Sequence, residues 1–221
     1  MAQNVRRLAR DRLVGAPARP DNKLMQPIDT SALLIIDVQD SFKVPGRWER
    51  RSSLNFEERL SALIDGYHRA GLPVFFFLHT DDDPGWRTTD PGYKLMDFIT
   101  RRPEEPLLHK TSRNCFTTTE LQRRLTELGI RRLAITGIQT EQCCETTARV
   151  AADLGYDVDF VTEATLTFPI PLRPFEWASP DALPVADVIE RTEYALRHRF
   201  ARIVTVSELL EELAVRTACP A

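Results

Sequence analysis

The sequence predicts a three-layer α/β domain, with a parallel sheet covered by helices on both faces. Short apolar, β-branched runs alternate with longer amphipathic stretches from Ala32 onward, a pattern typical of strand–helix–strand units whose strands are buried on both sides. Gly71 and Gly129 stand where two of the helices should end. The chain has 221 residues, 43% of them hydrophobic, which is enough for one domain with a sizeable core.

The elements follow from this alternation. Strands are predicted at 32–37, 73–78, 106–109, 132–137, 157–161 and 202–205. Helices are expected between them at 55–70, 118–129, 141–154 and 183–199, with a short final helix at 207–214. A Rossmann-like strand order, 3-2-1-4-5-6, would make strands 1 and 4 neighbours where the order reverses, and ligands bind at the carboxyl ends of the strands at that point.

One domain is expected over residues 31–221, preceded by an arm over residues 1–30. The arm is rich in arginine and has little apolar periodicity, so we expect it to be flexible or to wrap a neighbouring subunit. The Pro-rich stretch from Phe168 to Pro184 is expected to form a lid or a subunit contact. Both segments favour a homo-oligomer, a dimer or a tetramer.

Composition argues against several partners. A net charge of −3 and an isoelectric point near 5.9 give no basis for nucleic-acid binding, which depends on clustered Lys and Arg. The apolar runs are far shorter than the roughly 20 residues that span a bilayer, and no secretory signal is evident. We therefore expect a cytoplasmic protein whose four cysteines are thiols and whose partner is a small molecule.

A candidate nucleophile lies where the fourth strand leads into a helix. Thr140 is a plausible N-cap, which would make Cys143 the third helical residue. There the helix dipole would favour a thiolate, and the amides of Gln139 and Cys143 could receive an oxyanion. Cys144 points about 100° away from Cys143 on such a helix. The alternative is that both cysteines only pack in the core.

Two charged residues also end predicted strands. Asp37 follows a buried run, where a carboxylate must be paired or functional, and it could move the thiol proton. Lys110 would offset the repulsion between this carboxylate and a thiolate. Taken singly, Asp37 could instead shape a turn, and Lys110 could be an ordinary solvated lysine.

These residues resemble three blocks of the isochorismatase-like cysteine hydrolases, the superfamily of isochorismatases, nicotinamidases and N-carbamoylsarcosine amidases. Asp37-Val-Gln-Asp-Ser-Phe42 resembles its D-x-Q-x-x-F, Lys110-Thr-Ser-Arg-Asn-Cys-Phe116 its lysine block, and Gly137 to Ala148 its G-x-x-T-x-x-C-x-x-x-T-A. The resemblance implies a catalytic triad of Asp37, Lys110 and Cys143. It also implies a thioester acyl-enzyme and a cis peptide bond at Ile138–Gln139.

Two differences between this sequence and particular family members limit the reactions that we expect. Members that hydrolyse isochorismate typically lack the cysteine, so Cys143 argues against that activity. Nicotinamidases usually carry an Asp and two His as metal ligands after the second strand, whereas this chain has His79 followed by Asp81, Asp82 and Asp83. One His with flexible acids suits a transition metal poorly. We therefore expect no metal and no cofactor, although an oxygen-rich cation site is conceivable.

The leading hypothesis is an amidohydrolase that cleaves a small amide, carbamoyl or ureido C–N bond. Alternatives are ether or ester hydrolysis without a covalent intermediate, with Asp37 as the acid, and a non-catalytic thiol protein that binds a ligand or senses redox state. Aromatic and polar residues near the three blocks are candidates for the substrate pocket: Phe42, Trp48, His79, Trp86, Phe116 and Trp177.

Overall fold

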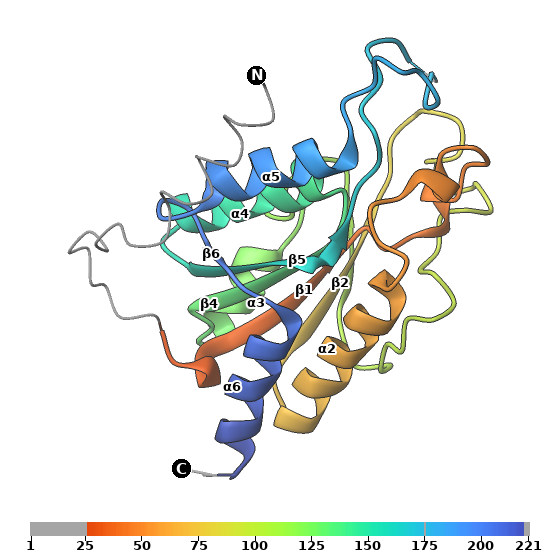
Figure 1. The fold of residues 1–221 in the computed structure, drawn as a ribbon. Helices are drawn as coiled ribbons and strands as arrows, with labels where there is room; N and C mark the ends of the chain where they lie inside the picture. Colours follow the sequence, from red (N-terminus) through yellow and green to blue (C-terminus); the bar gives the residue numbers. More distant parts are fainter. Residues whose placement is uncertain (1–25, 175, 219–221) are drawn as a thin grey trace, which may run out of the picture.

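The strand order follows the prediction. The computed structural model describes residues 26–174 and 176–218. Within these residues the chain forms one parallel sheet of six strands in the order β3-β2-β1-β4-β5-β6 (Figure 1). The strands are β1 (Ser31–Ile36), β2 (Val74–His79), β3 (Leu107–Lys110), β4 (Arg132–Ile138), β5 (Asp157–Leu166) and β6 (Arg202–Ile203).

Helices cover both faces of the sheet, which confirms the three-layer architecture (Figure 1). One face carries α2 (Phe56–Ala70) and α6 (Val206–Ala218), which pack against each other. The opposite face carries α3 (Leu121–Glu127), α4 (Glu145–Asp153) and α5 (Val185–Leu196). Because every residue of β1 and β4 is buried, these two strands form the middle of both hydrophobic clusters.

Several boundaries differ from the prediction. Helix α3 begins at Leu121 rather than 118, because side chains before it bond to the backbone and hold turns there. The Asn114 carboxamide oxygen accepts the amides of Phe116 and Thr117 at 2.8 and 2.9 Å, and the Thr119 hydroxyl accepts the amide of Leu121. Strand β5 runs to 166 instead of 161, and β6 has only two residues.

The central strands approach each other unusually closely at their carboxyl ends. Ile36 of β1 pairs with Gly137 of β4, and Gly137 has a φ of 118°. A Cβ atom at Gly137 would lie 2.0 Å from the carbonyl oxygen of Ile36, so only glycine fits. This approach places the loop that follows β4 directly beside Asp37, the residue after β1.

Residues directly before the predicted boundary at 30/31 contact the domain, and the boundary itself stays a prediction. Ile28–Thr30 form a short 3-10 helix, Ile28 packs against the core, and the Gln26 amide donates to Asp157 at 2.7 Å. The rest of the expected arm, residues 1–25, lies outside the described residues. No helix in the described part of the chain is long and apolar enough to cross a bilayer.

The Pro-rich excursion leaves the sheet after β5. Phe168 is fully buried, and Ile170 and Leu183 form an antiparallel bridge that closes the base of the excursion. Phe175, at its middle, is outside the described residues. Its assignment as a lid or as a subunit contact stays a prediction.

Candidate active site

The three residues of the predicted triad meet at the carboxyl ends of β1, β3 and β4. Asp37 follows β1 with a φ of 52°, Lys110 is the last residue of β3, and Cys143 lies in the helical turn after β4. The Lys110 Nζ atom is 2.8 Å from Asp37 Oδ2 and donates to the Cys143 Sγ atom at 3.5 Å. The cation therefore bridges the carboxylate and the sulfur.

Lys110 is held in this position by backbone carbonyl groups. Its Nζ atom also donates to the carbonyl oxygens of Ser112 and Arg113, at 3.1 and 3.3 Å. The side chains of Lys110 and Asp37 are completely buried. Although burial works against the ammonium group, the nearby Asp37 and Cys143 raise the pKa of Lys110, so it stays charged at neutral pH.

The environment of Cys143 corrects the expectation of a stabilised thiolate. Burial, followed by the negative charge of Asp37, raises the pKa of the Cys143 thiol well above its ordinary value, and Lys110 only partly opposes this. A helix dipole is weak beside full desolvation and a neighbouring charge. In the resting structure Cys143 is therefore a thiol.

Asp37 has the capacity to accept a proton from this thiol. Its carboxylate oxygens are buried, and neither forms a hydrogen bond of regular geometry with any described residue; the ion pair with Lys110 is their compensation. A buried carboxylate with free acceptor capacity can receive a proton from a neighbouring group.

The turn that carries Cys143 also differs from the prediction. Thr140–Cys144 form one π-helical turn that leads into α4. Thr140 does not cap it, because its hydroxyl group bonds to that of Thr165 at 2.8 Å. The Gln139 carbonyl oxygen instead accepts the amides of Gln142 and Cys144, at 3.2 and 3.1 Å. Cys143 is thus the fourth residue of the turn rather than the third.

The peptide bond between Ile138 and Gln139 is cis, at the position that the resemblance implies. The Gln139 amide donates to no acceptor among the described residues. Its side chain donates to Glu141 at 3.2 Å. Cys144 is completely buried and does not line the cavity described next, so only Cys143 presents its sulfur there.

A cavity of about 140 Å³ opens onto the Cys143 sulfur. Three of the six predicted pocket residues line it, namely Phe42, His79 and Trp86. The Trp86 ring meets Phe42 edge-on at 4.8 Å and lies 5.8 Å from His79. The remaining lining residues are Asp37, Asp81, Asp83, Arg113, Gln139, Gln142 and Cys143.

The other three aromatic residues lie outside this cavity. Phe116 stacks on Tyr156 at 5.9 Å in the core on the face of the sheet that carries α3 and α4. Trp48 packs beside Phe168, and Trp177 is stacked by the Arg47 guanidinium group at 4.5 Å. Trp48 and Trp177 thus lie around Phe168 and Arg47, which contact Phe42, and they do not line the cavity.

His79 is fixed by Gln39. The Gln39 carboxamide accepts the His79 amide at 2.7 Å and donates to its carbonyl oxygen at 3.0 Å. Burial, and then the charge of Lys110, lower the pKa of the His79 imidazole. A neutral ring can accept a hydrogen bond, and Arg113 Nη1 donates to its Nε2 atom.

Sequence reasoning missed four residues of the cavity as site residues: Asp81, Asp83, Arg113 and Gln142. Arg113 and Gln142 lie inside two of the quoted blocks, so a signal existed, but only the structure shows that they face the cavity. Asp81 and Asp83 were weighed only as metal ligands. Within the described chain no three His, Cys, Asp or Glu side chains gather as a metal site would require.

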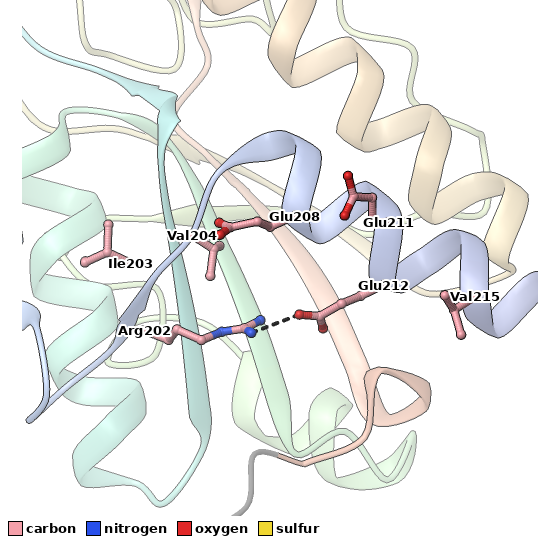
Figure 2. Close-up of a pocket in the computed structure, with 7 residues that line it drawn as sticks. All are labelled: Arg202, Ile203, Val204, Glu208, Glu211, Glu212 and Val215. Carbon is pink, nitrogen blue, oxygen red and sulfur yellow. Dashed lines mark ion pairs between the residues drawn. The ribbon is translucent and has the colours of Figure 1, made fainter. Parts of the chain in front are cut away.

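A larger cavity, of about 390 Å³, lies elsewhere, between β6 and α6. Figure 2 shows the Arg202–Glu212 ion pair on its floor. None of the predicted site residues lines it, so its size does not bear on the chemistry of Cys143.

Comparisons with known proteins agree with this geometry. The model of the isochorismatase domain matches residues 31–206. A streptothricin hydrolase of Streptomyces noursei is 30% identical over 86% of this chain and 73% of its own length. Nicotinamidase 3 of Arabidopsis thaliana is 32% identical over 62% of this chain and 74% of its own length.

Solved structures show the same fold. A cysteine hydrolase from Pseudomonas syringae pv. phaseolicola 1448A superposes with a TM-score of 0.78, covering 90% of this chain and 99% of that one, at 18% identity. At that identity the likeness bears on the fold alone. The domain match, however, covers most of the described chain, including Asp37, Lys110 and Cys143. The chain therefore belongs to the isochorismatase family of hydrolases.

Proposed function

We propose that the protein is a cysteine-dependent amidohydrolase, which cleaves a small amide, carbamoyl or ureido C–N bond through a thioester acyl-enzyme. The observation that carries the proposal is the position of Lys110. Its Nζ atom lies 2.8 Å from the Asp37 carboxylate and 3.5 Å from the Cys143 sulfur, which faces a cavity. An ion pair with a purely structural role would not require a cysteine beside it whose sulfur faces a cavity.

The proposed reaction begins with a proton transfer. As the Cys143 sulfur attacks the carbonyl carbon, Asp37 takes the thiol proton, which the raised pKa of this thiol would otherwise retain. Lys110 stabilises the negative charge wherever it lies between carboxylate and sulfur. Because Lys110 is held by two carbonyl groups, this stabilisation costs little reorganisation.

The tetrahedral intermediate would place its oxyanion near the start of the π-helical turn. The Gln139 amide, which has no acceptor within the described chain, and the amide of Cys143 are the proposed donors. Asp37 then gives its proton to the leaving nitrogen, and ammonia or an amine departs. Water attacks the thioester, Asp37 takes a proton from it, and release of the acid restores the thiol.

The names of two relatives support this class. One relative is a nicotinamidase and so acts on an amide, and another is a streptothricin hydrolase. The nicotinamidase, by the resemblance, would hold a metal that the residues after β2 in this chain do not suit. For this reason we propose the bond type and the nucleophile but not the same substrate.

The proposal is tested by ammonia release from a panel of primary amides and ureido compounds. We expect at least one substrate to be hydrolysed by the wild-type protein and not by Cys143→Ala. The matched control is Cys144→Ala, which removes a neighbouring buried thiol that does not line the cavity and should keep most of the activity. Equal turnover by wild type and Cys143→Ala would favour the alternative in which Asp37 acts without a covalent intermediate.

A further inference from the structure

Arg113 is a cation without a carboxylate partner in the wall of the active-site cavity. Its guanidinium group forms no ion pair with any carboxylate in the described ranges, whereas Arg123, Arg132 and Arg191 each do. The side chain nevertheless lines the same cavity as the Cys143 sulfur. A charged group in such a wall is compensated by solvent or by a ligand of opposite charge.

The backbone of Arg113 is tied to the catalytic lysine. Its carbonyl oxygen accepts a hydrogen bond from Lys110 Nζ at 3.3 Å, and that same Nζ atom lies 3.5 Å from the Cys143 sulfur. The backbone of Arg113 therefore lies next to the ion pair and the sulfur, and its side chain lines the same cavity as Cys143.

The guanidinium group is also oriented. Arg113 Nη1 donates to Nε2 of His79, a residue that is only 2% exposed and whose backbone is clamped by the Gln39 carboxamide. A guanidinium group has five N–H donors in a rigid fork. With one of them on His79, the others remain for a ligand, and a carboxylate is the group that such a fork binds with two parallel hydrogen bonds.

Besides Asp37, which is paired with Lys110, two acidic residues share the cavity wall with Arg113. The Oδ1 atom of Asp81 accepts the Asp83 amide at 3.0 Å, and its Oδ2 atom lies 3.3 Å from the same His79 Nε2 atom that receives the Arg113 hydrogen bond, so this carboxylate offsets part of the Arg113 charge. Asp83 and Arg113 are both exposed, so water screens both charges, and of the two it is the Arg113 side chain that donates to a buried ring. The oriented group with free hydrogen-bonding capacity is thus Arg113, and it favours an anion over a cation.

We propose that Arg113 determines substrate specificity by binding a carboxylate of the substrate, with His79 as the residue that positions it. The substrate class would then be small amides or ureido compounds that carry a carboxylate group. This inference rests on the proposed function, because it assumes that the scissile group binds at Cys143.

The test measures binding to Cys143→Ala by calorimetry, so that it does not depend on turnover. The probes are succinamate, butyramide and β-alaninamide, which carry a carboxylate, a methyl group and an ammonium group at the same distance from the amide. Malonamate and glutaramate extend the carboxylate series by one methylene in each direction. We expect a carboxylate probe to bind at least about tenfold more tightly than butyramide, as for a hydrogen-bonded charge pair.

Variants of Arg113 in the same background give the sharper comparison. Arg113→Gln should remove the preference, Arg113→Lys should keep part of it because lysine is a cation without the fork, and Arg113→Glu should favour β-alaninamide. The control is Arg87→Gln, since Arg87 is a nearby exposed arginine that donates to the Asp82 carbonyl oxygen and does not line the cavity. It should leave the preference unchanged.

Equal binding of the three probes, tighter binding of the ammonium probe, no binding of any probe, or a preference that survives Arg113→Gln would each overturn the assignment. The outcome is separable from that of the proposed function. Arg113-dependent binding of a carboxylate without Cys143-dependent ammonia release would retain the anion site and reject the amidohydrolase. Cys143-dependent hydrolysis of a neutral amide at a rate that Arg113→Gln does not change would retain the amidohydrolase and reject the anion site.

Discussion

The Nζ atom of Lys110 lies 2.8 Å from Oδ2 of Asp37, and both side chains are fully buried. Each charge compensates the other, because neither side chain is exposed on the protein surface. Removing one partner would leave an uncompensated buried charge, whereas removing both would leave two neutral side chains. The ion pair should therefore matter for stability as well as for catalysis.

Lys110→Met should lower the free energy of unfolding by about 3–5 kcal/mol, the usual cost of breaking a buried ion pair. The double variant Asp37→Asn/Lys110→Met should recover a large part of that loss, because no unpaired charge remains. Urea denaturation of both variants measures the two values. A double variant as unstable as the sum of its single variants would contradict the proposed mutual compensation.

Asp37→Asn should separate turnover from thiol reactivity. Turnover should fall by roughly 10²–10⁴-fold, as for loss of a general base. Alkylation of Cys143 by iodoacetamide should become faster, because the Asp37 charge helps to raise the pKa of this thiol and its removal leaves Lys110 to stabilise the thiolate. Peptide mass mapping identifies the labelled cysteine. Slower alkylation in Asp37→Asn would mean that the carboxylate does not oppose the thiolate.

The pH dependence of the same alkylation in the wild-type protein follows from the raised thiol pKa. Only the thiolate reacts, and its fraction grows roughly tenfold per pH unit below the pKa. Because burial and Asp37 hold the pKa of Cys143 well above its ordinary value, the rate should still be rising at pH 9. A rate that levels off near pH 7 would show a stabilised thiolate instead.

Phe116→Ala and Trp86→Ala should change different properties: the first mainly the stability of the protein, the second mainly KM. Phe116 is buried in the core against Tyr156, so its removal should cost about 3 kcal/mol of unfolding free energy with little change in KM. Trp86 is half-buried in the cavity wall, so its removal should raise KM more than it lowers stability. Thermal unfolding and steady-state kinetics on one substrate check both. A KM effect of Phe116→Ala alone would return that residue to the pocket.

The sequence predicts those features that depend on local pattern. Runs of apolar residues mark the strands, and the strand order places Asp37 beside the Cys143 loop. The start of α3 was not predictable in this way, because it depends on hydrogen bonds from Asn114 and Thr119 to the backbone.

Features that arise between distant segments were the harder ones. The thiol pKa of Cys143 depends on burial and on a carboxylate from another strand, and a local helix argument has no access to either. The clamp between Gln39 and His79 joins residues forty positions apart. Arg113 lies inside one of the resembling blocks, but its contact with His79 and its place in the cavity wall are tertiary properties.

The most direct test of the account is a mass spectrum of wild-type enzyme that is quenched in acid during turnover of a hydrolysed amide. We expect a mass increase equal to the acyl part of the substrate, located on the peptide that contains Cys143, absent from Cys143→Ala and retained in Cys144→Ala. An adduct on another residue, or undiminished turnover by Cys143→Ala with no adduct, would contradict the thioester mechanism.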